Sequence, residues 1–189
     1  MIQHTHPLPA YRSFLRQFFR DPRAVGAVSP ATRALSERVG AAARHAHRRH
    51  CEQAPGAALQ ILELGAGTGA LTHSISPLRP VLVERDAGWA ALLRERFPDL
   101  EVRQECATRS LASFSGPTGV VTSIPLLNNP QSRQLKDLLG ERYAEGLLRF
   151  CILYTYGWSN PLKGVGFREE RRFGFVPRSL PPACVWVYR

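Results

Sequence analysis

The chain has few cysteines, and they lie far apart. None belongs to a closely spaced pair, and the four positions are Cys51, Cys106, Cys151 and Cys184. Structural zinc sites and small disulfide-stabilised domains both require cysteines at short, regular spacings. We therefore predict no metal site and no disulfide framework, and we expect a reducing compartment, the cytoplasm.

Long apolar runs are also missing. Residues 1–14 contain no apolar segment followed by a small-residue cleavage site, so they do not predict a secretory signal. The longest strongly apolar stretch, around residues 150–158, falls well short of the ~20 residues that a membrane-spanning helix requires. We expect any contact with a membrane to be peripheral.

Acidic residues and lysines are scarce. Of the 25 basic residues 23 are arginines, and the 15 acids leave a net charge of +10. Residues 1–50 hold nine arginines and two acids, residues 163–189 hold six basic and two acidic groups, and residues 51–162 hold ten and eleven. Arginine-rich ends favour phosphate-bearing partners, either lipid or nucleic acid. A near-neutral middle between basic ends indicates a catalytic core whose termini meet an anionic surface.

The length and composition are those of one compact domain with a modest extension. The chain has 189 residues, of which 44% are hydrophobic, with 15 glycines and 15 prolines. Residues 44–56 show no apolar periodicity and carry a basic run, so we interpret them as a solvated linker. We predict a basic, helical, membrane-contacting extension over residues 1–55 and a catalytic core over residues 56–189.

A short amphipathic helix is predicted over residues 11–20. At 100° per residue its apolar side chains form one arc and its arginines and other polar residues form the rest. The apolar set is Tyr11, Phe14, Leu15, Phe18 and Phe19. Two interpretations stay open: the helix packs on the protein's own sheet, or it lies in a lipid interface with its arginines at the phosphates. A second helix is predicted from a Ser29-Pro30 cap to about Ala46.

From residue 59 onward, short apolar strands alternate with helices. The predicted strands are 59–64, 81–84, 100–104, 120–124 and 150–156, and the predicted helices are 69–76, 87–97 and 132–145. This alternation predicts an α/β, Rossmann-like fold with a mostly parallel sheet and helices on both faces. Residues 171–176 and 183–188 are joined by a connection too short for a helical crossover. We expect them to form an antiparallel pair at the edge of the sheet.

A glycine-rich turn follows the first of these strands, in the run ILELGAGTG at residues 61–69. Gly65, Gly67 and Ala70 also satisfy the dinucleotide-binding fingerprint, and a generic tight turn is the simplest alternative. Glu63, however, would repel a pyrophosphate and suits a ligand with an ammonium group. Glu84 ends the next strand 19 residues after Gly65, close to the ~20 expected for a carboxylate that binds ribose hydroxyls. An ammonium group plus a ribose describes S-adenosylmethionine.

The sequence around this turn resembles class I S-adenosylmethionine-dependent methyltransferases. Over nearly the whole chain it is also similar to the small bacterial phospholipid N-methyltransferases, in the segments FLRQFFRDPRAVGAVSPATRALSERV, LVERDAGWAALLRERFP, SIPLLNNP, YTYG and GFVPRSLPPACVWVYR. The resemblance implies methyl transfer to the head-group amine of phosphatidylethanolamine toward phosphatidylcholine. It also implies docking on the inner membrane through residues 11–20.

The predicted cofactor contacts follow the strand ends. They are Glu63, Gly65, Ala66, Gly67, Gly69, Glu84, Arg85, Glu105, Cys106 and Ser123. The sequence departs from the family pattern at Cys106, where an adenine-binding aspartate is expected, and Glu105 is the candidate replacement. It departs again at residues 122–125, Thr-Ser-Ile-Pro, which are bulkier than the expected Ser-Gly-Leu-Pro.

The predicted catalytic residues lie after the fourth strand and at the end of the fifth. They are Ser123, Pro125, Tyr154 and Tyr156. The two tyrosines are two residues apart on one strand, so they share a face of the sheet. Their rings either hold a methylated ammonium by cation–π attraction or simply pack in the core. No residue stands out as the base that removes the proton of the amine.

Two other functions remain open from the sequence. Ribosomal RNA adenine dimethylases share the core and the basic charge. Their proline motif, however, usually begins with Asn or Asp, and in this chain Ser123 stands near that position. A helical domain also follows their sheet, whereas this sequence ends at Arg189, directly after the last predicted strand. A non-catalytic cofactor-binding protein is the third class. We expect a monomer, with nucleic acid the less favoured partner, and the head group and the number of methyl groups added stay open.

Overall fold

The computed structural model describes residues 31–127, 132–179 and 181–189. Contacts along the chain define one compact unit from Ala31 to Arg189. The predicted amphipathic helix at residues 11–20 and the predicted cap at Ser29 lie outside the described residues. No helix within the described ranges is long and apolar enough to cross a bilayer.

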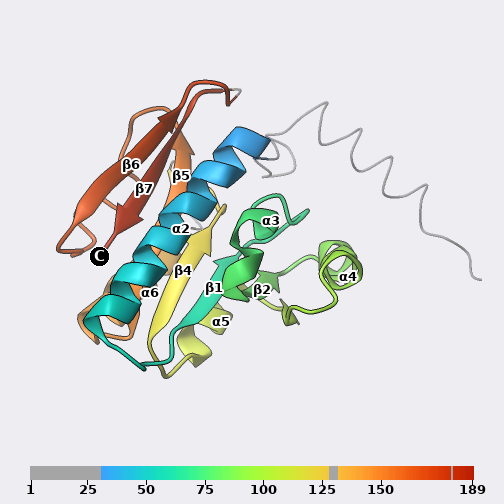
Figure 1. Ribbon diagram of the computed structural model, residues 1–189, viewed down its shortest axis with the longest axis horizontal. Coiled ribbons are helices and arrows are strands. Elements are labelled where there is room, and N and C mark those ends of the chain that lie inside the picture. The colour runs from blue at the N-terminus through green and yellow to red at the C-terminus, as the bar shows by residue number, and fades with distance from the viewer. Residues whose placement is uncertain (1–30, 128–131, 180) are drawn as a thin grey trace, which may run out of the picture. The chain divides into compact units, whose positions relative to one another are not determined.

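A seven-stranded sheet forms the centre of this unit (Figure 1). The strands are β1 (Gln60–Leu64), β2 (Val81–Glu84), β3 (Val102–Gln104), β4 (Thr118–Thr122), β5 (Leu148–Tyr156), β6 (Glu170–Val176) and β7 (Ala183–Tyr188). Their order is β3-β2-β1-β4-β5-β7-β6. The first five in this order are parallel, whereas β7 is antiparallel to both β5 and β6. The predicted fold class is confirmed, with β7 inserted so that β6 is the outermost strand.

Helices cover both faces of the sheet, as the βα alternation predicts. They are α2 (Arg33–Gln53), α3 (Thr72–Ile75), the short 3-10 helix η1 (Ser76–Leu78), α4 (Ala87–Arg96), α5 (Ala107–Ser113) and α6 (Arg133–Ala144). On one face, Leu35 of α2 and Ile75 of α3 share a buried cluster with Phe150 of β5. On the other face, the cluster includes Leu111 of α5 and Leu139 of α6.

Helix α2 belongs to the core, so the predicted linker at residues 44–56 and the predicted boundary at residue 56 are corrected. The helix continues to Gln53 and packs against β5, β7 and β6, running along the strands in Figure 1. Its buried stripe is rich in small residues, among them Ala42, Ala43 and Ala46. Small side chains let a helix approach closely, but they give a weak apolar signal beside a basic run. The helix begins after Thr32, whose hydroxyl accepts a hydrogen bond from the Leu35 N–H at 3.3 Å.

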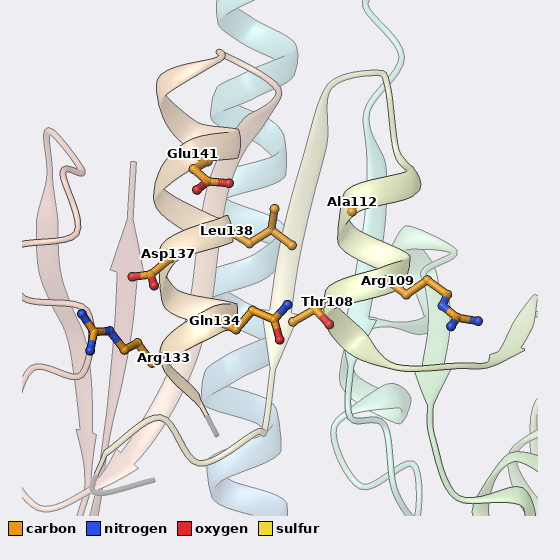
Figure 2. A pocket seen from close by; sticks show the side chains of 8 residues that line it. All are labelled: Thr108, Arg109, Ala112, Arg133, Gln134, Asp137, Leu138 and Glu141. Atoms are coloured by element: carbon orange, nitrogen blue, oxygen red, sulfur yellow. The ribbon is translucent and has the colours of Figure 1, made fainter. Parts of the chain in front are cut away.

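Helix α5 is the element that the sequence does not predict. It has seven residues and one large buried apolar side chain, Leu111, which is too little to establish a helical period. A groove of about 960 Å³ lies between α5 and α6, and Figure 2 shows Gln134 and Leu138 of α6 facing Thr108 of α5 across it. The groove is lined by Thr108, Arg109, Ala112, Arg133, Gln134, Asp137, Leu138 and Glu141.

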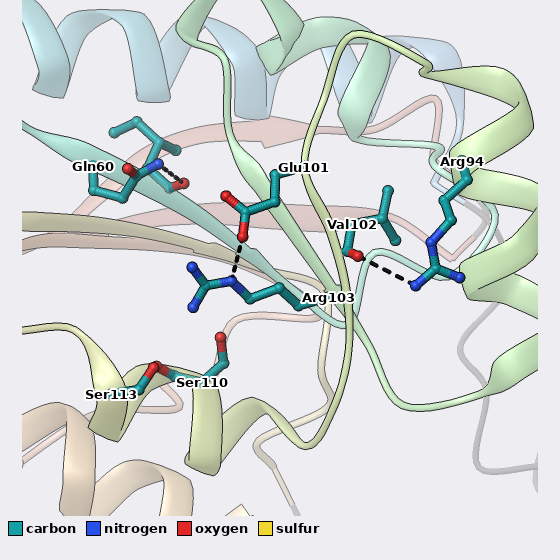
Figure 3. A network of polar contacts seen from close by, with 8 residues as sticks. Gln60, Arg94, Glu101, Val102, Arg103, Ser110 and Ser113 are labelled. Carbon is teal, nitrogen blue, oxygen red and sulfur yellow. Dashed lines mark hydrogen bonds and ion pairs between the residues drawn. The ribbon is translucent and has the colours of Figure 1, made fainter.

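The short strand β3 is held by side chains as well as by its ladder. Arg94 of α4 donates to the carbonyl of Val102 at 3.3 Å, and Arg103 pairs with Glu101 at 2.6 Å, beside α5 (Figure 3). The Arg103 guanidinium also lies over the ring of Phe114, 4.8 Å from its centre. These contacts add to the ladder that joins β3 to β2.

Candidate active site

The carboxyl ends of β1, β2, β4 and β5 meet at one edge of the sheet. Leu64 pairs with both Val83 and Thr122, and Thr122 pairs in turn with Leu153. The loops that follow β1 and β4 are therefore neighbours, and the last residues of β5 extend beyond the end of β4. Open α/β sheets bind ligands at this edge, where the strand order reverses. The strands and loops that carry the predicted site residues end at this edge.

The glycine-rich loop uses its N–H groups within the protein. The N–H groups of Gly65 and Ala66 both donate to the carbonyl of Val83, at 2.8 and 3.1 Å. The Gly67 N–H donates to the carboxylate of Glu84 at 2.9 Å. A phosphate cradle needs such groups to point at the ligand. Since three successive N–H groups are already engaged, the loop does not suit a pyrophosphate, and the dinucleotide interpretation loses its support.

Glu84 holds the loop in place with both carboxylate oxygens. Its Oε2 accepts from Gly67, and its Oε1 accepts from the Asp86 N–H at 2.9 Å. Asp86 caps α4 by accepting from the Trp89 N–H at 2.9 Å. Each carboxylate oxygen can accept a further hydrogen bond. The half-buried carboxylate is therefore pre-oriented at the end of β2, where hydroxyl groups of a ligand can donate to it.

Glu63 is a buried carboxyl group on β1. It is 1% exposed, and it accepts a hydrogen bond from the Thr72 hydroxyl at 2.7 Å. Burial raises the pKa of Glu63 to about 8; the Thr72 hydrogen bond opposes this shift and the charge of Glu84 adds to it. A nearby cation would favour the charged form. Direct contact between Glu63 and an ammonium group stays a prediction, because the side chain is enclosed beneath α3.

The loop after β4 is tied to the loop after β1. The Ser123 hydroxyl donates to the carbonyl of Gly65 at 2.7 Å, and the Thr122 hydroxyl donates to the carbonyl of Leu64 at 3.0 Å. Ile124 packs directly over Gly65, which has φ +72°: a Cβ on Gly65 would lie 2.6 Å from Ile124 Cγ1. The larger residues of this loop thus fill the space above a glycine. Ser123 positions the two loops, and Pro125 follows at the same edge.

Glu105 and Cys106 lie between β3 and α5, at the same edge of the sheet. Cys106 is exposed and occupies the N-cap position of α5, with its Sγ 3.2 Å from the Thr108 hydroxyl. Hydrogen bonding to Thr108 lowers the pKa of the Cys106 thiol, and the charge of Arg85 adds to this effect. The half-buried Glu105 precedes it. Polar groups therefore border the site where the sequence predicts the adenine contact.

Tyr154 and Tyr156 form an edge-to-face pair on β5. Their ring centres are 5.6 Å apart and their planes lie at 76°. Burial raises the pKa of both phenols, so neither is a base at neutral pH. The rings also border the buried cluster that includes α2. The rings therefore pack against the core, and the cation–π contact with an ammonium group stays a prediction.

Comparisons with known proteins identify the fold. No family model matches the chain. The 23S rRNA methyltransferase ErmE is 19% identical and aligns over 84% of this chain and 68% of its own, with a TM-score of 0.54. Magnesium protoporphyrin IX methyltransferase (ChlM) from Synechocystis PCC 6803, solved with bound SAM, is 11% identical and aligns over 93% and 95%, with a TM-score of 0.55. The fold is that of class I methyltransferases.

The chain is also similar in sequence to a curated methyltransferase. The ornithine lipid N-methyltransferase of Singulisphaera acidiphila is 28% identical over 93% of this chain and 94% of its own length. Together with the carboxylates at the ends of β1 and β2, the relatives support S-adenosylmethionine as the cofactor, as the sequence predicts.

The groove between α5 and α6 is the feature that sequence reasoning missed, since α5 itself gives no periodic signal.

Proposed function

We propose that this chain is an S-adenosylmethionine-dependent methyltransferase that acts on the primary amine of a membrane lipid head group. The observation that carries the proposal is the glycine-rich loop: its N–H groups are used by Val83 and Glu84, and the buried carboxyl group of Glu63 lies on the strand that leads into it. Such a loop suits a cationic amino acid and a ribose better than a phosphate. The full-length likeness to an ornithine lipid N-methyltransferase supports a lipid amine.

Phosphatidylethanolamine is the head group that the sequence resemblance implies. The relative is named for ornithine lipid, and the side chain of ornithine also ends in a primary amine. The chemistry shared by the two is a primary alkylammonium group at the surface of a bilayer. We therefore propose a lipid amine as the substrate class, with phosphatidylethanolamine as the first candidate and peripheral association with the inner membrane as its location.

The described residues divide the work of the reaction. When bound, S-adenosylmethionine supplies a methyl group on a positively charged sulfur. Glu84 would hold the ribose, and Glu63 would favour the cationic amino-acid end. Ser123 fixes the loop after β4 against the loop after β1. The rings of Tyr154 and Tyr156 would hold the amine by cation–π attraction, worth roughly 0.5–2 kcal/mol.

The proton of the amine must leave before nitrogen can attack the methyl group. Only the neutral amine has the lone pair that would accept this methyl group. Tyr154 and Tyr156 stay protonated at neutral pH because burial raises their pKa, so they do not accept this proton. Water at the open edge of the site is the acceptor that this arrangement favours. Catalysis then rests mainly on holding the two reactants in line.

A transfer assay tests the proposal. Purified full-length protein with labelled S-adenosylmethionine is offered liposomes of phosphatidylethanolamine, liposomes of ornithine lipid and total RNA in separate reactions. We expect label in one or both lipids and none in RNA. The control is Glu84→Ala, which should lose transfer to lipid. Label in RNA with none in either lipid would refute the lipid substrate, and no binding of S-adenosylmethionine would refute the enzyme itself.

A further inference from the structure

Two large aromatic side chains are exposed on the described surface. Trp158 is 61% exposed and Phe175 is 38% exposed. Their rings are stacked, with centres 4.8 Å apart and planes at 20°. The guanidinium of Arg172 lies over the Trp158 ring, 4.7 Å from its centre. We call Trp158, Arg172 and Phe175 the aromatic patch.

The strand register explains why three residues distant in sequence meet there. Trp158 follows β5 by two residues, and the Gly157 N–H donates to the carbonyl of Pro182 at 3.2 Å, just before β7. Arg172 and Phe175 lie on the outermost strand, β6. The ladder between β6 and β7 shifts register between Arg172 and Gly174. That irregularity breaks the strict alternation of side chains, so Arg172 and Phe175 can both contact Trp158.

The aromatic patch lies toward the same edge of the sheet as the candidate active site. Trp158 follows the carboxyl end of β5, and Phe175 is one residue from the end of β6, which runs in the same direction as β5. The loops after β1 and β4 lie at this edge too. A surface that meets the aromatic patch therefore faces the same edge of the sheet as the glycine-rich loop.

The charge around the aromatic patch is positive. Residues 157–182 contain five basic residues and two acids. Both acids are engaged within the protein: Glu169 pairs with Arg189 at 2.7 Å, and Glu170 accepts from Asn160 at 2.6 Å. The basic residues are Lys163, Arg168, Arg171, Arg172 and Arg178, and all five are exposed. Tryptophan beside arginine is the pairing that bilayer interfaces favour, with the ring among the head groups and the cation at the phosphates.

We propose that the aromatic patch is a docking surface for an anionic phospholipid bilayer. The inference rests on the proposed lipid substrate, since docking at this edge would bring head groups to the active site. Trp158 and Phe175 insert at the head-group level, and Arg172 with Arg178 faces the phosphates. This surface is formed by described residues alone, whereas the predicted helix at residues 11–20 lies outside the described ranges.

Tryptophan fluorescence reports the docking directly. The chain has three tryptophans: Trp158 is exposed, Trp89 is half-buried and Trp186 is buried, and residues 1–30 have none. With vesicles of phosphatidylglycerol and phosphatidylcholine, we expect the emission of the full-length protein to shift to the blue and to be quenched by brominated lipid. Trp158→Phe should remove most of that signal. An emission spectrum that vesicles leave unchanged while the protein sediments with them would overturn the proposal.

Binding is measured by sedimentation with the same vesicles. Trp158→Ser with Phe175→Ser should weaken binding about tenfold or more, since losing about 60 Å² of apolar burial is enough for a tenfold change. Arg172→Gln should weaken vesicle binding less than the double variant does. The loss caused by Arg172→Gln should be larger at low salt than at high salt, because salt screens the attraction of the arginine for anionic lipid. The matched control is Arg103→Gln, which removes an arginine from over another aromatic ring, Phe114, and should bind as the parent does. Unaltered binding of the double variant would overturn the proposal.

A soluble substrate separates this inference from the proposed function. Methyl transfer to a short-chain phosphatidylethanolamine below its micelle concentration needs no bilayer. We expect the double variant to retain that activity and to lose activity on vesicles. If the parent methylates the short-chain lipid but the double variant loses nothing on vesicles, the docking surface is wrong and the function stands. If the double variant instead loses binding to RNA or self-association, the aromatic patch serves that partner and the bilayer proposal fails.

Discussion

At the scale of single residues, Glu84 links the loop, the helix α4 and the proposed ribose contact. Its carboxylate accepts from Gly67 and Asp86, so it shapes the site before any ligand arrives. We expect Glu84→Ala to weaken binding of S-adenosylmethionine by about 1.5–3 kcal/mol, the range for hydrogen bonds to a charged group. Isothermal calorimetry measures this. Glu52→Gln, which alters an exposed carboxylate near Arg48 on α2, is the control that should bind normally, and unchanged affinity in Glu84→Ala would contradict the assignment.

Glu63 predicts a pH dependence of stability. Below its ordinary pKa of 4.5 the group is protonated in both the folded and unfolded chain. Between 4.5 and about 8 only the unfolded chain ionises, so the free energy of unfolding falls as pH rises, by up to ~1.4 kcal/mol per unit. Above about 8 the loss is complete.

Glu63→Gln removes this ionisation and keeps an acceptor for Thr72. We therefore expect the variant without cofactor to be more stable than the parent at pH 7.5, and the difference to shrink at pH 5. Thermal unfolding at the two pH values is the measurement. Equal pH dependence in parent and variant would mean that Glu63 is charged in the folded chain.

At the scale of elements, the strands are easier to predict than the pieces between them. Buried parallel strands such as β2, VLVE, are continuous apolar runs, and Glu63 and Glu84 can be placed from their strand ends. α5 is missed because one leucine sets no period. The core role of α2 is missed because its stripe is mostly alanine. The hydrogen bonds from the loop N–H groups to the carbonyl of Val83 cannot be predicted from the sequence either, because they depend on the register between β1 and β2.

The core role of α2 predicts the effect of a truncation within it. Leu35 is fully buried in the cluster on the α2 face of the sheet. Leu35→Ala should lower the free energy of unfolding by about 2–5 kcal/mol, and the whole unit should still unfold in one transition. Urea unfolding followed by circular dichroism checks this. The control Glu37→Gln removes an exposed ion pair with Arg33, worth at most about 1 kcal/mol. If the main unfolding transition of Leu35→Ala had the same midpoint as that of the parent, α2 would not be part of the core.

At the scale of the whole molecule, the basic ends are expected to act together on one anionic surface. The helix predicted at residues 11–20 carries Arg12, Arg16 and Arg20, each of which can contribute ~1 kcal/mol near anionic lipid. Changing all three to Gln should lower sedimentation with anionic vesicles by about one to two orders of magnitude. Affinity for S-adenosylmethionine in solution is the control and should persist. If the triple variant bound anionic vesicles as well as the parent, the membrane role of residues 11–20 would be wrong and the packing interpretation would be favoured.

The position of β7 between β5 and β6 orders events during synthesis. Among the described strands, β6 pairs only with β7, although it precedes β7 in the chain. As the chain leaves the ribosome, β1 to β5 can assemble with the glycine-rich loop while β6 still has no neighbour to pair with. Residues 183–188 then join β5 and β6 at once. We expect the nascent chain to gain its cofactor loop early and to bring Phe175 to Trp158 only when this last strand has been made.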